Sequence, residues 1–301
     1  MVTMSLLVLL AASAHAQDKS EQVSPERARA NFGRQVVLAA DDVRAFPEAP
    51  AGFDKLPAGG MSGRTEVFEY DSTVTGARRK AVVYLPPHYT SDQKYPVLYL
   101  LHGIGGNERE WSGYVHADAI VDNLITGGKA TPMIVVMPNG RALANDRAPA
   151  PDQTFTPQNA EGFAKFERDL LDCLIPAVQA KYSASTDRAE RALAGLSMGG
   201  GQSLNFGLKH LDTFAWVGGF SSAPNTRPPA ELVPDPAAAR EQLKLLYLSC
   251  GNKDGLISIS QRVHTFLKDQ KIPHIWNVDD HGHDRETWGS NLYHFAQQIF
   301  R

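Results

Sequence analysis

The chain carries short runs of consecutive apolar residues, and stretches of helical pattern separate the later runs. A run without polar alternation suits a strand that is covered on both faces, as in a parallel sheet. The expected strands, the first of them an alternating edge strand, are residues 66–71, 80–86, 96–103, 133–140, 191–197, 214–220, 244–251 and 274–280. The clearest helices are 162–181, which Pro176 should kink, and 259–271. This alternation predicts an α/β fold with a mostly parallel sheet of about eight strands and helices on both faces.

Length and charge narrow the class of protein further. A chain of 301 residues with a formal net charge of −3 can form one large globular domain and has no basic cluster beyond Arg78–Lys80. We therefore expect no nucleic-acid partner. Cys173 and Cys250 both fall in apolar segments, so we expect two unpaired core thiols. No Cys/His cluster has the spacing of a zinc site, and we expect neither a metal nor an organic cofactor.

The first residues have the pattern of an export signal. Residues 1–16 contain a short apolar run and an A-x-A sequence that ends at Ala16, although the usual basic residues before the run are missing. The run is too short to span a bilayer, so we expect a secreted or periplasmic protein and no membrane partner. Residues 17–62 are polar and weakly patterned, and we expect a partly ordered lead-in to a catalytic domain over 63–301.

Ser197 stands in the pentapeptide G-L-S-M-G, after the expected strand 191–197 and before a glycine-rich helix. Small residues of this kind also fill ordinary turns, so the flanking elements decide the interpretation. A G-x-S-x-G sequence between a strand and a helix is the nucleophile elbow, which exposes the serine hydroxyl on a sharp turn. The sequence therefore predicts a nucleophilic serine, with the Met198 amide at the helix start as a donor to an oxyanion.

A serine nucleophile needs a base, and the base needs an acid to orient it. With this elbow the acid and then the histidine should follow the serine along the chain. Asp254 lies directly after the seventh expected strand, although N-K-D-G is also a common turn. After the last strand, His281 and His283 are both candidates, and spacing alone does not choose between them. The second oxyanion donor should come from the glycine-rich loop 102–111, with the Ile104 amide as the best candidate.

Four segments together resemble carbohydrate esterase family 1, namely YLLHGIGGNEREW, AGLSMGGGQSLNFGL, FAWVGGFSSAPN and CGNKDGL. The similarity runs from about Gly60 to the C-terminus and implies the α/β-hydrolase fold. It also implies the activity of feruloyl and acetylxylan esterases, with the nucleophile at Ser197 and the acid at Asp254. The family's histidine falls on His283 in HDRETW, where Arg285 departs from the commoner H-D-W form.

The resemblance and the residues together predict an exported serine carboxylesterase. Its expected substrate is a feruloyl or acetyl ester on plant cell-wall polysaccharide, so the partner is an acylated oligo- or polysaccharide. Alternatives are a hydrolase of other short acyl esters, like enterochelin esterases or S-formylglutathione hydrolases, and an acyltransferase in which an alcohol replaces water. A catalytically inactive binding protein on the same fold is a further alternative.

The segments around the expected site indicate an open, polar groove. Residues 221–242 are short, rich in proline and poor in large apolar residues, and 139–162 is a polar insertion, so we expect no large lid. Trp111 and Trp288 should lie in loops that border the serine, and Phe155 is the aromatic residue of the polar insertion. We expect these three rings to bind substrate, the alternative for the tryptophans being ordinary packing in the core or at its rim.

Overall fold

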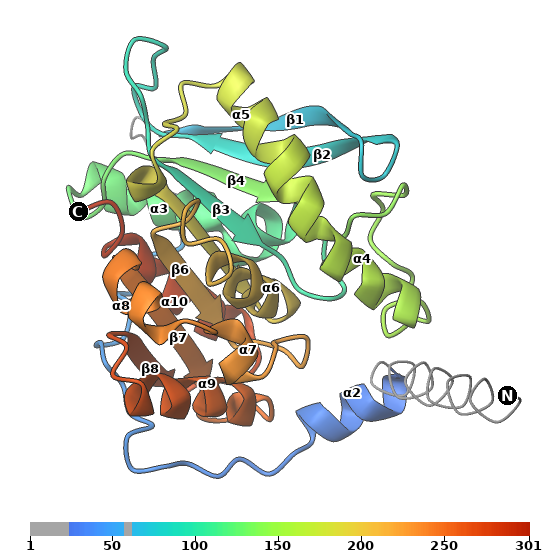
Figure 1. Ribbon diagram of the computed structural model, residues 1–301. Coiled ribbons are helices and arrows are strands. Elements are labelled where there is room, and N and C mark those ends of the chain that lie inside the picture. The colour runs from blue at the N-terminus through green and yellow to red at the C-terminus, as the bar shows by residue number, and fades with distance from the viewer. Residues whose placement is uncertain (1–23, 57–61) are drawn as a thin grey trace, which may run out of the picture.

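A computed structural model describes residues 24–56 and 62–301, so the expected signal peptide lies outside the described residues. One sheet has eight strands in the order β1-β2-β4-β3-β5-β6-β7-β8 (Figure 1). The strands are β1 (Arg64–Ser72), β2 (Ala77–Leu85), β3 (Val97–Leu101), β4 (Ile134–Pro138), β5 (Arg191–Leu196), β6 (Trp216–Phe220), β7 (Leu245–Gly251) and β8 (Ile275–Asp279). The pairs β1–β2 and β2–β4 are antiparallel and all other pairs are parallel. The predicted mostly parallel α/β sheet is confirmed.

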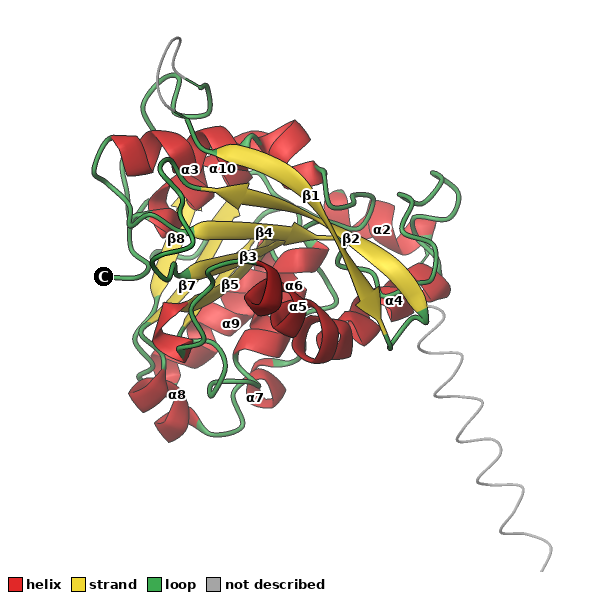
Figure 2. Cartoon of the chain, turned by 90° about the horizontal axis from the view of Figure 1, so that it is seen from above, coloured by secondary structure: helices red, strands yellow, loops and turns green. Residues whose placement is uncertain are grey.

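Helices connect the strands and cover both faces of the sheet (Figure 2). The α-helices are α2 (Pro25–Phe32), α3 (Ala117–Thr126), α4 (Pro157–Asp169), α5 (Ile175–Lys181), α6 (Met198–Gly207), α7 (Pro229–Leu232), α8 (Pro236–Gln242), α9 (Ile257–Asp269) and α10 (Arg285–Ala296). Two π-helical turns, η1 (Trp111–Val115) and η2 (Leu170–Leu174), and a 3₁₀ turn, η3 (Arg188–Glu190), complete the helical elements of the described residues. Among those residues, no helix combines the length and the apolar character that crossing a membrane requires.

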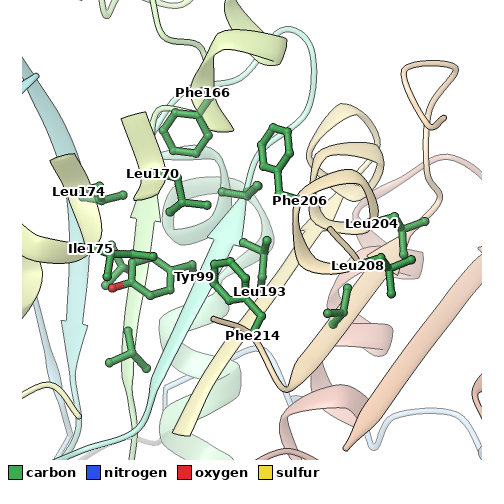
Figure 3. Close-up of a cluster of buried hydrophobic side chains, with 14 of the residues drawn as sticks. Tyr99, Phe166, Leu170, Leu174, Ile175, Leu193, Leu204, Phe206, Leu208 and Phe214 are labelled. Atoms are coloured by element: carbon green, nitrogen blue, oxygen red, sulfur yellow. The ribbon is translucent and has the colours of Figure 1, made fainter. Parts of the chain in front are cut away.

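Strand β3 shows why its sequence lacks polar alternation. Tyr99 and Leu101 belong to the apolar cluster under α4, α5, α6 and α9, whereas Leu98 and Leu100 belong to the cluster under α3 and α10. Figure 3 shows the first cluster, where the ring of Phe166 and its neighbours face the central strands. Burial of each such large side chain stabilises the fold by about 2 kcal/mol. Every residue of the strand is therefore a core residue.

The helix expected over 162–181 begins earlier, at Pro157, and consists of α4, the π-turn η2 and α5. Pro176 lies in the first turn of α5, directly after the π-turn. A proline lacks the amide hydrogen and collides with the carbonyl four residues earlier, so a regular α-helix cannot continue through it. The π-turn η2 is wider than an α-helical turn and so accommodates the proline ring. The disturbance expected at Pro176 is therefore a change in the hydrogen-bonding pattern of the helix.

The lead-in over residues 24–56 begins with α2 and continues as an extended segment that runs beneath α9 in Figure 1. It then follows the outer edge of β8, where the Val278 amide donates to the Val43 carbonyl at 3.1 Å. The Trp276 indole donates to Asp42 at 2.9 Å, and the Ala45 amide donates to the Asn277 side chain at 2.8 Å. The segment thus covers the edge strand of the sheet.

Both cysteines are buried and unpaired, as the sequence predicted. Cys173 belongs to η2, and its thiol lies 3.4 Å from the Thr73 hydroxyl. Cys250 lies near the end of β7 and donates to the carboxylate of Asp254 at 3.3 Å. The Cys250 thiol therefore lies at the carboxyl ends of the parallel strands, next to the predicted acid Asp254.

Candidate active site

Ser197 occupies the turn between β5 and α6, with a φ of 52° and a ψ of −117°. This is a strained conformation for a residue with a side chain, and it needs support from its surroundings. The Ser197 amide donates to the Phe220 carbonyl at 2.9 Å, and the Ser197 carbonyl accepts from the Ala223 amide at 3.0 Å. Hydrogen bonds to the end of β6 and to the loop after it therefore hold the serine on a sharp strand-to-helix turn.

The flanking glycines allow this turn to pack against the neighbouring strand. A Cβ atom at Gly195 would lie 2.5 Å from the carbonyl carbon of Gly199, and one at Gly199 would collide with the Leu101 carbonyl at the end of β3. No side chain fits at either position. The two glycines of G-x-S-x-G are thus explained by backbone-to-backbone approach, which a larger residue would prevent.

Three predicted residues form a hydrogen-bonded series at the carboxyl ends of β5, β7 and β8. The Ser197 Oγ atom lies 2.9 Å from Nε2 of His283. The Nδ1 atom of His283 lies 2.8 Å from Oδ2 of Asp254. Because a carboxylate only accepts, Nδ1 carries the proton and Nε2 is free to accept from the serine hydroxyl. This is the arrangement that activates a serine for attack on a carbonyl carbon.

The loops after β7 and β8 hold the acid and the histidine together. The Lys253 amide donates to the His281 carbonyl at 3.0 Å, which joins the two loops next to Asp254. Asp284 caps α10 by accepting from the Thr287 amide at 3.0 Å, so His283 stands immediately before the helix. His281 instead faces the lead-in, with its Nε2 atom 3.8 Å from Glu48. The structure therefore brings His283, and not His281, to the serine.

The hydrogen bonds of Asp254 favour its ionised form. Burial raises the pKa of the Asp254 carboxyl, but the hydrogen bond from His283, the attraction of that ring and the Leu256 amide outweigh it and leave the pKa below its usual value. The Leu256 amide donates to Oδ1 at 2.8 Å. The Cys250 thiol remains protonated as a donor, because burial and the nearby Asp254 raise its pKa well above the usual range. A charged acid thus faces the imidazole.

The loop after β3 approaches the nucleophile as expected. A Cβ atom at Gly103 would lie 3.5 Å from Cβ of Ser197. Ile104 packs against the small apolar cluster that contains Met198, so the two residues expected to supply oxyanion donors are neighbours. Met198 is the first residue of α6, where amides have no acceptor within the helix. The start of α6 and the Gly103–Ile104 segment thus border the serine from two sides.

Three side chains that the sequence reasoning missed hold this loop. The Gly103 amide donates to Glu110 at 2.6 Å, and Asn159 donates to the Ile104 carbonyl at 3.2 Å. His102 accepts from the Gly140 amide at Nε2, so its Nδ1 donates to the Gly103 carbonyl at 2.6 Å.

Burial shifts the pKa values of two of these side chains. Burial lowers the pKa of His102 to about 4, so the ring is neutral. Burial also raises the pKa of Glu110, against the effect of the Gly103 amide that bonds to it. Only the glycines marked this loop in the sequence, because a lone Glu or Asn carries no recognisable pattern.

Trp111 is not a wall of the site, contrary to expectation. It begins η1 instead of lying in an open loop, it is 1% exposed, and its indole donates to the Leu101 carbonyl at 2.8 Å. A ring with no free surface cannot contact a substrate, so the prediction of substrate binding at Trp111 is wrong. Its place in the core is the packing alternative.

Trp288 and Phe155 differ from Trp111 in their surroundings. Trp288 lies in α10 instead of a loop, is buried, and meets the ring of His283 edge to face at 5.2 Å. It packs beside the imidazole. Phe155 is half-buried in the turn before α4, and its contact with substrate stays a prediction. No group of three or more His, Cys, Asp or Glu side chains that could hold a metal ion occurs within residues 24–56 and 62–301.

Comparison with known proteins identifies the family. Residues 72–294 match the family described as putative esterase. The chain belongs to this esterase family. The match begins at the end of β1 and covers Ser197, Asp254 and His283, whereas the lead-in lies outside it. The carboxylesterase class and the α/β-hydrolase fold follow from the family and from the sheet.

Two curated proteins are similar to this esterase over part of their length. It is 33% identical over 244 residues to an endo-1,4-beta-xylanase/feruloyl esterase of Xylanibacter ruminicola, which covers 79% of this chain and 32% of the relative. It is 31% identical over 161 residues to an esterase of Mycobacterium tuberculosis, covering 53% of this chain and 32% of that protein. The chain thus spans about a third of the length of these curated relatives.

A solved structure supports the same resemblance. The ferulic acid esterase of Anaeromyces mucronatus in complex with ferulic acid superposes with a TM-score of 0.76 at 28% identity, covering 88% of this chain and 98% of that one. A feruloyl esterase module from Clostridium thermocellum, in complex with sinapinate, gives a TM-score of 0.70 at 21% identity and shows the shared fold.

Proposed function

We propose that this esterase is an exported serine carboxylesterase that hydrolyses feruloyl or acetyl esters on plant cell-wall polysaccharide through an acyl-enzyme. The observation that carries the proposal is the hydrogen-bonded series from Ser197 through His283 to Asp254. The xylanase/feruloyl esterase relative supports the substrate class. Export belongs to the proposal because residues 1–16 have the pattern of a signal peptide.

In the first half of the reaction, the Ser197 hydroxyl oxygen attacks the ester carbonyl carbon. His283 accepts the hydroxyl proton at Nε2, and Asp254 stabilises the resulting imidazolium through the proton on Nδ1. The negative charge that develops on the carbonyl oxygen meets the amides of Met198 and Ile104. Each donor of this kind contributes about 3 kcal/mol to transition-state stabilisation.

Formation of the acyl-enzyme releases the alcohol, and its hydrolysis in the second half of the reaction releases the acid. His283 gives its proton from Nε2 to the leaving alcohol oxygen as the carbon–oxygen bond breaks, which leaves the acyl group on Ser197. A water molecule then takes the place of the alcohol. His283 removes a proton from the water as its oxygen attacks the acyl carbon. When the bond between that carbon and Ser197 Oγ breaks and the acid departs, His283 returns the proton from Nε2 to Oγ.

Apolar side chains beside the nucleophile support an acyl group that is itself apolar. Met198 follows the nucleophile directly, Leu256 lies two residues after Asp254, and both pack in one cluster with Phe163, Ala223 and Ile259. Ile104 of the loop after β3 packs against this cluster, to which α9 contributes Ile259. A small acetyl group and the flat ring of a hydroxycinnamate both suit such a surface.

The test is a panel of esters with the wild-type chain and Ser197→Ala. We expect hydrolysis of methyl ferulate, acetylated xylan and nitrophenyl acetate, and weak action on S-formylglutathione. Ser197→Ala should lose about 10⁴-fold or more in kcat with its melting temperature unchanged, whereas the exposed Ser91→Ala should match the wild type. Retention of a tenth of the activity by Ser197→Ala would refute the serine mechanism. A clear preference for S-formylglutathione would refute the proposed substrate class.

A further inference from the structure

The lead-in places an aromatic side chain against the histidine of the site. Phe32, the last residue of α2, meets the imidazole of His283 with ring centroids 5.1 Å apart and an angle of 65° between the planes. Trp288 contacts the same imidazole but is buried, whereas Phe32 is 42% exposed. Phe32 therefore contacts the imidazole of His283 and also presents part of its ring to solvent.

The end of α2 is fixed in this place by contacts with α9 and the loop before it. A Cβ atom at Gly255, the residue after Asp254, would collide with the Phe32 carbonyl, so the two backbones touch. The Arg34 guanidinium donates to the Ser258 hydroxyl at 3.2 Å, and Gln261 donates to the Val37 carbonyl at 2.9 Å. Phe32 is thus part of the folded site.

The reaction geometry decides which half of the ester Phe32 borders. His283 must deliver its proton from Nε2 to the leaving oxygen, so that oxygen has to lie within hydrogen-bond distance of the ring. The acyl carbon is instead held at Ser197 and the oxyanion donors. A solvent-exposed side chain that rests on the imidazole therefore lies on the alcohol side of the ester.

We propose that Phe32 is a specificity-determining residue of this esterase, which binds the alcohol half of the substrate by stacking against a sugar ring. This inference rests on the proposed function. An exposed aromatic ring presents an apolar surface that matches the C–H face of a pentose or hexose, and a methyl group is too small to cover it. Phe32 lies in the lead-in, outside the residues that the family match covers.

The experiment holds the acyl group constant and changes the alcohol. Phe32→Ala, Phe32→Leu and Phe32→Tyr are compared with the wild type on methyl ferulate and on a feruloylated arabinoxylan oligosaccharide. If the wild type acts only on acetyl esters, methyl acetate and an acetylated xylo-oligosaccharide replace them. Val37→Ala is the control, because Val37 lies in the same lead-in and is 71% exposed.

We expect Phe32→Ala and Phe32→Leu to lower the preference for the sugar ester over the methyl ester, as a ratio of kcat/KM, by about tenfold. For the sugar ester the loss should appear as a higher KM, because both esters form the same acyl-enzyme and therefore share its hydrolysis. Phe32→Tyr should keep the preference. An unchanged ratio would overturn the inference, whether both esters lose equally, as for a residue that only positions His283, or neither changes. A wild-type chain that hydrolyses no ester would refute the proposed function instead.

Discussion

Replacing Asp254 by asparagine tests how the acid acts on His283. The Leu256 amide donates to Oδ1 at 2.8 Å, so the asparagine oxygen must keep that position to satisfy the buried amide. The new NH₂ group then takes the place of Oδ2, which lies 2.8 Å from Nδ1 of His283. Because that NH₂ group donates, Nδ1 must accept, and the ring proton moves to Nε2. A histidine in that tautomer cannot accept the proton of Ser197.

The magnitude follows from loss of the general base with the geometry intact. An inverted tautomer of this kind lowers kcat by about 10⁴-fold, which corresponds to about 5 kcal/mol in the activation free energy. We expect this loss for Asp254→Asn in a methyl ferulate or nitrophenyl acetate assay near neutral pH. Asp92→Asn, in an exposed loop before β3, should keep wild-type activity.

Stability measurements on the same variant check the charge of the acid. The pKa of Asp254 is lowered in the folded state, so its charge stabilises the fold above the unfolded pKa of about 3.9, and this contribution is lost as the pH falls through the folded value. Asp254→Asn should therefore lose less stability than the wild type as the pH falls below about 3.9. In the activity assay described above, a kcat of Asp254→Asn within tenfold of the wild-type value would refute the tautomer argument.

Three further predictions concern the histidines and the length of acyl chain that the site accepts. His283→Ala should lose about 10⁴-fold in kcat, and His281→Ala should be much milder; the opposite ranking in the same assay would mean that the wrong histidine contacts the serine. Burial disfavours the charged ring and lowers the pKa of His102 from 6.5 to about 4, so the full stability is present above pH 6.5 and falls as the pH drops towards 4, where only the unfolded chain binds the proton. His102→Gln should flatten that part of the curve in denaturant titrations, and an unchanged slope would contradict it. If the polar segments 139–162 and 221–242 form no large lid, as the sequence predicts, kcat/KM should fall beyond about eight acyl carbons without interfacial activation, and a steady rise towards long chains would contradict an open groove.

The sequence was sufficient for the sheet and for the three residues that the structure joins in one hydrogen-bonded series. Strands covered on both faces carry an apolar run that is visible without any knowledge of the fold. Parallel strands bring their carboxyl ends to one edge, so residues directly after β5, β7 and β8 had to meet there. Ser197, Asp254 and His283 could therefore be named from their places after strands, with the resemblance deciding between His281 and His283.

The sequence could not predict which way a side chain turns or what the lead-in covers. Trp111 follows a polar, glycine-rich loop, yet the π-turn that starts there directs its ring inward onto Leu101. Glu110 and Asn159 each form a hydrogen bond to the backbone of the loop after β3, and such single contacts leave no pattern in the sequence. Phe32 contacts His283 although the two residues are far apart in the sequence, and no hydrophobic pattern in the lead-in predicts this contact.

The most direct test of the serine mechanism is to trap the acyl-enzyme. The chain is mixed with nitrophenyl acetate, quenched in acid within the first turnover, and digested for mass spectrometry of its peptides. The account predicts one acetyl group on the peptide that contains Ser197, and none on that peptide when the substrate is omitted. Turnover by a chain whose only acetylated peptide lies elsewhere, with Ser197 unmodified, would contradict it.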